Sequence, residues 1–388
     1  MGQLTMSLYL RNMRERYQAA NKSEKGRILD EFCATSEQHR KSAIRSLNGT
    51  PKPGYTKKRG RKKVYAPEEV LEPLKNIWLA TDQMCGQRLK RAIPQWLPFY
   101  EKHYGSLSKT VKQQLMKMSS ATIDRLLKPL RCAHRRGLGG TKPGSLLKTQ
   151  IPIAGAQWDN TVPGFVEADT VAHCGEHLSG DFIWSLTLVD IATTWTENRA
   201  TWNKGSAGVL KAIQSIEASL PFSLKGFDSD NGSEFLNHHL LRYLNDKSVK
   251  FTRSRPYKKN DNAHVEQKNW THVRQLLGYE RLSQPRLVPL INALYSQEVS
   301  CLRNHFIPTL KLLKKERIGS KIIKRYDPPQ TPYERVLASP HVSKANKEQL
   351  GSLHKRLDPF ELSQAIQAKL HKIYAQVDRS NRQKRRAI

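Results

Sequence analysis

The pattern of apolar and polar positions begins with helical periodicity in residues 1–50. Apolar side chains recur at helical spacing as far as Tyr17, and two further helical segments follow. Ser23 and Ser36 are the expected N-caps of these segments, because a Ser side chain accepts hydrogen bonds from free helix amides. Asn48-Gly49 is the expected stop signal. We therefore predict a small all-α domain here.

The two short helices that close this domain are joined tightly, which predicts a helix-turn-helix that binds DNA. The outer face of its second helix would carry His39, Arg40 and Arg45. The alternative is a plain helical hairpin whose charges are only solvated.

A second helical pattern occupies residues 67–136. An apolar stripe runs from Val70 to Trp78, and residues 119–130 are typical of a capped recognition helix. Arg125 and Lys128 would point outward from that helix. We predict a second helical DNA-binding domain, in which the Trp and Leu side chains form a core rather than stack on bases.

The pattern changes to short strands after a Gly-rich hinge at residues 137–150. Within residues 151–280, three apolar runs predict an antiparallel meander at 164–171, 182–190 and 193–200. A helix over 206–220 precedes a buried strand that would lie parallel to the first, through a right-handed crossover. From Phe227 to Leu277 the chain reads strand, loop, helix, strand, loop, helix. This order predicts a mixed α/β sheet with helices packed on its faces.

Residues 281–388 form a basic C-terminal region. The pattern predicts helices over 287–303 and 360–377, with a strongly basic strand pair within 307–325. Arg379–Arg386 reads as a basic tail. We expect this region to contact DNA and a second protomer.

The net charge narrows the class of partner. The 388 residues include 66 Lys and Arg against 34 Asp and Glu, a formal charge of +32. This excess indicates a polyanionic partner, and nucleic acid is favoured because no amphipathic membrane anchor stands out. No apolar run of membrane-spanning length, secretion signal or C-x-x-C pair is present. The expected location is the cytoplasm, in association with the nucleoid.

Residues 51–66 form a basic linker with seven basic and no acidic side chains. Within it, Arg59-Gly60-Arg61 resembles an AT-hook, in which two arginines lie in a narrow minor groove. An ordinary linker that touches phosphates is the alternative.

Three carboxylates lie on separate predicted elements. Asp169 is in the first strand, Asp230 follows the buried strand, and Glu266 lies early in a helix that begins near Asn262. Such a set can bind a pair of hard divalent cations, and without cations the like charges would repel. The sequence therefore predicts a Mg²⁺-dependent site.

These acids and their surroundings resemble a known motif. The phrase D-N-G-x-E-F at Asp230–Phe235, the preceding strand acid, and a Glu after 35 further residues are similar to the DDE motif. That motif belongs to the integrase-type catalytic core of retroviral integrases and bacterial insertion-sequence transposases. The similarity covers residues 164–278. It implies a ribonuclease-H-like fold in which Asp169, Asp230 and Glu266 are catalytic and bind two Mg²⁺ ions, with Mn²⁺ as a substitute.

The same resemblance implies a DNA transposase. Such an enzyme binds transposon-end DNA and target DNA, nicks 3′ ends and joins them to the target as a dimer or larger homo-oligomer. Basic side chains near the third acid are candidates for the phosphates that flank the scissile bond; they are Lys258, Lys259, His264, Lys268 and Arg274. A solvated basic face is the alternative.

Other acids compete for the three positions. Asp228 would share a strand face with the second acid, and Glu167 would share one with Asp169. Asp190 ends its strand, where a carboxylate that caps a turn is expected. Glu234 either contacts DNA or opens the next helix, which is the commoner role. A DNA-binding regulator, an inactive transposon-derived protein and a plain nuclease of the same fold are the alternative functions.

Overall fold

The structure is a computed structural model that describes residues 3–49, 65, 67–133, 161–230, 232, 234–254, 263–318 and 320–386. Four of the expected DNA contacts lie outside these residues, namely Arg59, Arg61, Lys258 and Lys259. The chain divides into two compact units, Met1–Val64 and Tyr65–Ile388. Each unit is described by itself.

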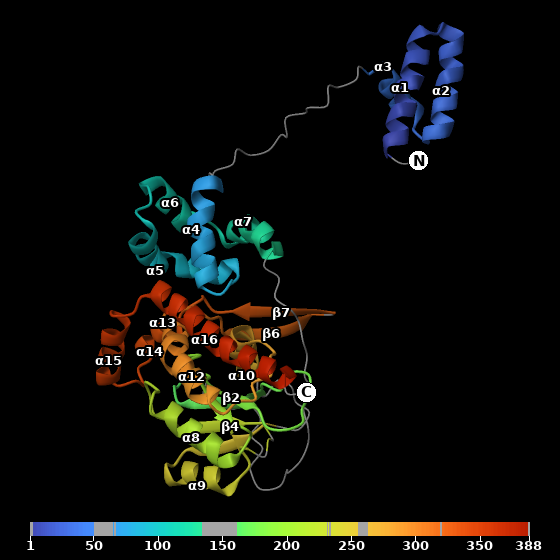
Figure 1. The fold of residues 1–388 in the computed structure, drawn as a ribbon. Coiled ribbons are helices and arrows are strands. Elements are labelled where there is room, and N and C mark those ends of the chain that lie inside the picture. Colours follow the sequence, from blue (N-terminus) through green and yellow to red (C-terminus); the bar gives the residue numbers. More distant parts are fainter. Residues whose placement is uncertain are drawn as a thin grey trace. The chain divides into compact units, whose positions relative to one another are not determined.

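The first unit contains three helices, α1 (Gln3–Ala19), α2 (Lys22–Ser36) and α3 (Arg40–Asn48). The three helices pack together (Figure 1). The core between them includes Met13, Phe32 and Leu47. The helical content of residues 1–50 agrees with the sequence pattern.

Two of the expected caps in this unit were wrong. Asn21, rather than Ser23, caps α2, because Asn21 and Glu24 exchange hydrogen bonds in a capping box. Ser36 is the last residue of α2 rather than the cap of the next helix, and the His39 side chain caps α3 instead. The reciprocal Asn–Glu pair satisfies two free donors at once, which a single Ser hydroxyl does not.

The second unit is built on a five-stranded sheet of order β3-β2-β1-β4-β5. The strands are β1 (Phe165–Ala172), β2 (Ile183–Asp190), β3 (Thr196–Trp202), β4 (Gly226–Ser229) and β5 (Lys250–Arg253). The first three form an antiparallel meander, whereas β4 runs parallel to β1 and β5 runs parallel to β4. The predicted mixed α/β sheet with helices on its faces is confirmed.

Helices cover both faces of this sheet (Figure 1). On one face, α8 (Ser206–Glu217) and α9 (His238–Asp246) pack on a core that includes Val166, Ala168 and Phe227. The other face carries α10 (Ala263–Lys268), a π-helical segment η1 (Asn269–Arg274) and α11 (Gln275–Leu277). Next along the chain are α12 (Leu287–Ala293), a second π-helical segment η2 (Leu294–Val299) and α13 (Ser300–Phe306).

Four helices precede the sheet in sequence: α4 (Pro67–Ala80), α5 (Gly86–Tyr104), α6 (Lys109–Lys117) and α7 (Ser120–Ala133). They share one hydrophobic core with α12, η2, α13 and the last helix, α16 (Pro359–Arg386). The Trp96 indole N–H donates to the carbonyl of Phe306 at 3.2 Å within this core. Residues 67–133 therefore form one packed body with residues 277–377.

Between α13 and α16 lie a two-stranded hairpin, β6 (Leu312–Ile318) and β7 (Lys321–Tyr326), and two helices, α14 (Pro332–Ala338) and α15 (Lys344–His354). The predicted strand pair is therefore confirmed. The backbone of α16 is helical as far as Arg386, through the segment that the sequence suggested as a tail. No described helix is both long and apolar enough to span a membrane.

The free edge of β3 is covered by side-chain amides rather than by another strand. Asn304 accepts from the backbone N–H of Thr196 at 3.0 Å and donates to its carbonyl at 3.0 Å. Asn292 makes the same pair of bonds with Ala200, at 2.6 and 3.0 Å. Each amide substitutes for a neighbouring peptide group, which removes an edge that could pair with another chain.

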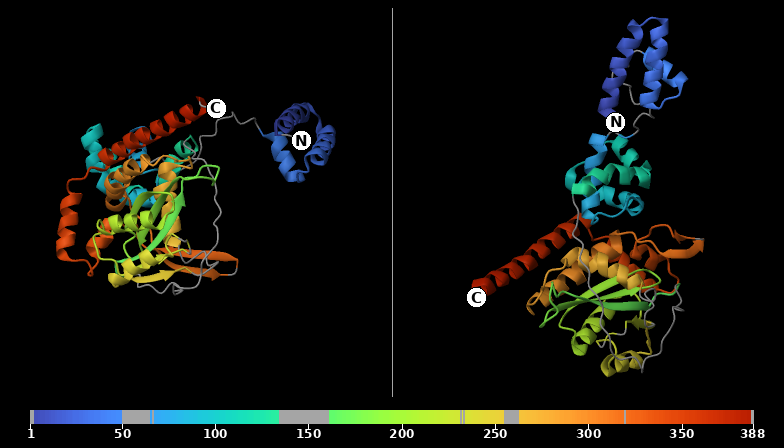
Figure 2. Two further views of the ribbon diagram at one scale, coloured as in Figure 1. Left: turned by 60° about the horizontal axis from the view of Figure 1, so that its bottom comes forward. Right: turned by 90° about the vertical axis from the view of Figure 1, so that its right-hand side faces the viewer.

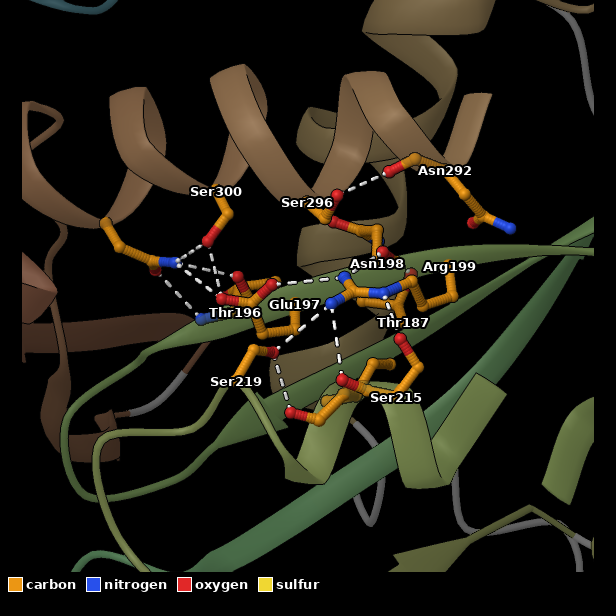
Figure 3. Close-up of polar contacts among 12 residues, drawn as sticks. Thr187, Thr196, Glu197, Asn198, Arg199, Ser215, Ser219, Asn292, Ser296 and Ser300 are labelled. Carbon is orange, nitrogen blue, oxygen red and sulfur yellow. Dashed lines mark hydrogen bonds and ion pairs between the residues drawn. The ribbon is translucent and has the colours of Figure 1, made fainter. Parts of the chain in front are cut away.

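A buried ion pair lies beside this edge (Figure 3). Glu197 is 2% exposed and Arg199 is 5% exposed, with 3.4 Å between Oε2 and Nη1. Arg199 Nε donates to the Ser215 hydroxyl of α8 at 3.0 Å, while Glu197 Oε1 accepts from the Ser300 hydroxyl of α13 at 2.5 Å. The pair therefore ties β3 to the helices on both faces of the sheet.

Candidate active site

Asp169 and Asp230 meet because β1 and β4 are parallel neighbours. In the register of these strands, Glu167 lies opposite Asp228 and Ala168 lies opposite Ser229. Asp169 and Asp230 each follow this last pair by one residue, and the charge of Asp230 raises the pKa of Asp169, so the two acids lie near each other. The two acids therefore share one end of the sheet although 60 residues of chain lie between them.

The helix that carries Glu266 is joined directly to the first of these acids. The amide of Asn269, one turn after Glu266, donates to Asp169 Oδ2 at 2.6 Å. Glu266 is exposed on α10, and its negative charge contributes to raising the pKa of Asp169. The structure thus brings Asp169, Asp230 and Glu266 to one region.

The electrostatics of Asp169 show how crowded this region is with negative charge. Burial raises the pKa of Asp169 to about 7, and the charge of Asp230 is the next largest cause. Glu234 and Glu266 also raise this pKa, whereas a hydrogen bond from the Thr170 N–H, 2.7 Å from Oδ1, lowers it. A cation among these acids would remove the cost of their mutual repulsion.

Asp230 is in a similar environment. Its pKa is raised first by burial and then by the charge of Glu234. The Gly232 N–H, which donates to Asp230 Oδ1 at 3.0 Å, and the charge of Lys204 act in the opposite direction.

Glu234 is a fourth carboxylate near the site, and unlike the exposed Glu266 it is buried; the sequence-based interpretation missed this role. It is 1% exposed, accepts from the Thr170 hydroxyl at 2.8 Å and lies 2.7 Å from Lys204 Nζ. Its other oxygen, Oε2, is buried and has no hydrogen-bond partner among the residues that the structure describes. A Cβ at position 232 would lie 2.4 Å from that oxygen, so a larger residue there would force the Glu234 carboxylate to shift.

The expectation that Glu234 opens the next helix was wrong. Helix α9 begins at His238, and the Asn237 side chain caps it. Glu234 belongs to the D-N-G-x-E-F phrase, and this could have indicated that its carboxylate pairs with a cationic side chain near the site. Lys204, in the turn after β3, carried no such signal, and only the fold shows its position over the Trp184 ring, 4.9 Å from the centroid.

The three competing acids have structural partners. Glu167 Oε2 accepts from the backbone N–H groups of His264 and Val265 at 3.1 and 3.0 Å, so it caps the start of α10 from the neighbouring strand. Burial raises the pKa of Glu167 to about 8, with these two bonds acting in the opposite direction.

The other two competing acids, Asp228 and Asp190, also accept hydrogen bonds from neighbouring residues. Asp228 accepts from the Thr252 hydroxyl at 2.6 Å. Asp190 accepts from the N–H groups of Gly164 and Thr193, at 2.8 and 2.7 Å, which confirms the expected turn cap.

The acids of the motif fit a hard cation in chemistry, since all their donor atoms are carboxylate oxygens. Their oxygens do not all lie within 4.8 Å of one another; in the described chain, the group that meets this distance is His103, Asp358 and Glu361. Lys102 already neutralises that second group, with Nζ 2.8 Å from Asp358 and 3.0 Å from Glu361. We interpret it as an ion-pair network that joins α5 to α16.

The expected DNA contacts of the helical regions differ in their surroundings. Arg40 forms an exposed ion pair with Asp30 of α2, and Arg45 lies in the last turn of α3. Arg125 and Lys128 are both exposed on α7, the orientation that the sequence predicts.

Lys268 does not lie on a solvated face. It is half-buried, and burial lowers the pKa of Lys268 to about 7. The positive charges of Arg88, Arg303 and Arg335, from α5, α13 and α14, lower it further.

Two further basic residues that were expected to contact DNA, His264 on α10 and Arg274 on η1, are also partly enclosed. His264 is half-buried, and its pKa is lowered by burial and then by the charge of Lys311. The Arg274 guanidinium stacks over the Tyr279 ring, 4.8 Å from the centroid, and burial lowers the pKa of Arg274.

Comparisons with known proteins give one similar sequence and several similar structures. The chain is 39% identical over 325 residues to "Uncharacterized protein y4rM" of Sinorhizobium fredii (strain NBRC 101917 / NGR234), covering 83% of this chain and 92% of that protein. No family model matches the chain. The catalytic core domain of BIV integrase aligns with 46% of this chain and 96% of its own, at 16% identity and a TM-score of 0.31. For the HTLV-2 integrase catalytic core domain in complex with magnesium (dimeric form), the shares are 39% and 92%, at 14% identity and a TM-score of 0.29.

Proposed function

This chain belongs to the family of protein y4rM of Sinorhizobium fredii, and from its own site we propose that it is a DDE-type DNA transposase. It would bind transposon-end DNA, nick the 3′ ends in a Mg²⁺-dependent step and join them to target DNA. The ribonuclease-H-like identity of the core, with its integrase-type motif, is part of this proposal.

One observation carries the proposal. The proposal is supported by the parallel pairing of β1 and β4, which ends one residue before Asp169 and Asp230, and by the Asn269–Asp169 hydrogen bond, which joins the helix of Glu266 to β1. These are the three acids that the motif selects. Their competitors Glu167, Asp228 and Asp190 accept hydrogen bonds in a helix cap, a strand contact and a turn cap, respectively.

The residues of the chain have separate tasks in this mechanism. Asp169, Asp230 and Glu266 would hold the cations, and Asn269 would orient Asp169 through its amide. Bound Mg²⁺ would supply Lewis-acid activation of the attacking water or 3′-hydroxyl and would neutralise the phosphate. Lys204, paired with Glu234 at the edge of the acids, would offset the negative charge next to Asp230.

The basic composition supports DNA as the substrate. A formal charge of +32 favours contacts with phosphates, so binding should weaken steeply as salt rises. Of the side chains proposed to contact DNA, Arg125 and Lys128 are exposed and accessible to a duplex. A flat response of the dissociation constant to salt would count against DNA.

The test is strand transfer with Asp169→Asn, Asp230→Asn and Glu266→Gln, each assayed with a labelled end duplex and Mg²⁺ or Mn²⁺. Asp246→Asn is the matched control, because Asp246 is an exposed acid on α9. We expect the three variants to bind DNA and to lose nicking and joining, while the control keeps both.

Wild-type joining in the three variants would overturn the proposal and favour a DNA-binding regulator. Metal-dependent cleavage without joined products would instead assign a nuclease to the same site.

A further inference from the structure

The β6–β7 hairpin projects from the second unit, and both views in Figure 2 show it extending past the helices. Its described side chains are almost all exposed: Leu313 is 68% exposed, Ile323 41% and Tyr326 46%. Lys314, Lys324 and Arg325 are exposed as well. Neither face of the hairpin therefore packs on the rest of the protein at these positions.

The charge of the hairpin opposes its own stability. Residues 311–326 contain seven Lys or Arg and one acid, Glu316. Lys314 lies opposite Arg325 in the ladder, and like charges directly across a strand pair are destabilising. Glu316 forms an ion pair with Lys314. An uncovered two-stranded hairpin is marginally stable in water even without such repulsion.

The base of the hairpin lies near the start of the helix that carries Glu266. Lys311, just before β6, donates from Nζ to the carbonyl of Ala192 at 2.8 Å, in the turn that joins β2 to β3. The charge of Lys311 also acts on His264, at the start of the helix that carries Glu266. The hairpin therefore begins next to the catalytic helix and extends outward from it.

From this geometry we propose that the β6–β7 hairpin is a DNA-binding ribbon that contacts the duplex held at the acidic site. The inference rests on the proposed function and adds a surface to it. A two-stranded ribbon fits the major groove, and its cations reach the phosphates on both sides. DNA is favoured over a second copy of the chain, because the exposed cations would repel those of an identical hairpin, whereas a phosphate backbone would neutralise them.

The test compares two triple variants that remove the same charges. The hairpin variant is Lys314→Gln/Lys324→Gln/Arg325→Gln, and the control is Lys344→Gln/Lys355→Gln/Arg356→Gln, which changes exposed side chains on and just after α15. Binding of a labelled duplex is measured by fluorescence anisotropy over a series of salt concentrations.

For the hairpin variant we expect the slope of log affinity against log salt to fall by about 2.7, at about 0.9 for each lost phosphate contact. The control should keep the wild-type slope. Thermal unfolding should occur at no lower a temperature than in the wild type for either variant, since the altered side chains are exposed and the hairpin variant also loses like-charge repulsion.

An unchanged slope in a folded hairpin variant would overturn the proposal. If instead the hairpin variant changes the sedimentation of the DNA-free protein and keeps the slope, the hairpin binds a second protomer, and the proposal is also wrong. Either result leaves the proposed function standing as long as the Asp169, Asp230 and Glu266 variants lose joining.

Discussion

Glu167 offers a sharp test of how the fold holds the catalytic helix. Its carboxylate, 4% exposed on β1, accepts from the N–H groups of His264 and Val265 at the first turn of α10. Glu167→Leu removes this acceptor, whereas Glu167→Gln keeps a carbonyl oxygen of nearly the same shape. The two variants therefore separate the hydrogen bonds from the volume of the side chain.

The magnitude follows from the two donors left without a partner. Each buried N–H that loses its acceptor costs about 1–3 kcal/mol, so the gross loss in Glu167→Leu is about 2–6 kcal/mol. Burial of the apolar leucine offsets about 1–2 kcal/mol of this. The central values, about 4 and about 1.5 kcal/mol, give an expected net loss of about 2.5 kcal/mol in the free energy of unfolding, and we expect a loss of less than about 1 kcal/mol for Glu167→Gln.

Urea unfolding measures these free energies, and amide hydrogen exchange at His264 and Val265 reports the first turn of α10 directly. In a joining assay, Glu167→Leu should lower the rate of joining with little change in DNA affinity, and Glu167→Gln should restore most of the rate. Glu176→Leu is the control, because Glu176 is an exposed acid of the same unit. Wild-type stability and exchange in Glu167→Leu would refute the reasoning.

Other expectations concern the buried parts of the same unit. Arg199→Met leaves the Glu197 carboxylate buried without its ionic partner and should lower the free energy of unfolding by about 3–5 kcal/mol in urea titrations; a loss below about 1 kcal/mol would contradict this. Burial, with a smaller effect of a nearby charge, lowers the pKa of His173 from 6.5 to about 3. Protons therefore bind the unfolded chain first, and stability falls as pH drops from 6.5 towards 3, by about 2 kcal/mol at pH 5. His173→Gln should remove that part of the pH dependence, and an unaltered profile would refute the assignment. Trp96→Ala should cost about 3–5 kcal/mol and shift a single calorimetric transition of residues 65–388; two separate transitions would show that α4–α7 unfold alone.

Much of the sheet could be predicted from the sequence because its strands are short apolar runs between clear turns. The meander, the parallel strand before Asp230 and the helix of Glu266 are all present in the structure. The sequence also predicted that Asp190, at the end of its strand, caps a turn, and the structure confirms this.

Other features depend on contacts that no local pattern contains. Lys268 was expected to contact a phosphate because it is a basic residue close to the third acid in sequence. In the structure, however, α5, α13 and α14 bring further cations around it. Whether a basic side chain on a helix is exposed depends on what packs over that helix, and here the covering residues are far away in sequence. The buried pairing of Glu234 with Lys204 could not be predicted for the same reason.

The shared core of the second unit has a consequence for how the protein is made. Its buried members extend from Val70 near the start of the unit to Val377 near the end of the chain. During synthesis, α4–α7 leave the ribosome long before the partners that cover their apolar faces. The nascent chain must therefore keep Trp78, Trp96 and their neighbours from aggregating until α16 emerges, and a message truncated before Phe360 would yield a protein with an open core.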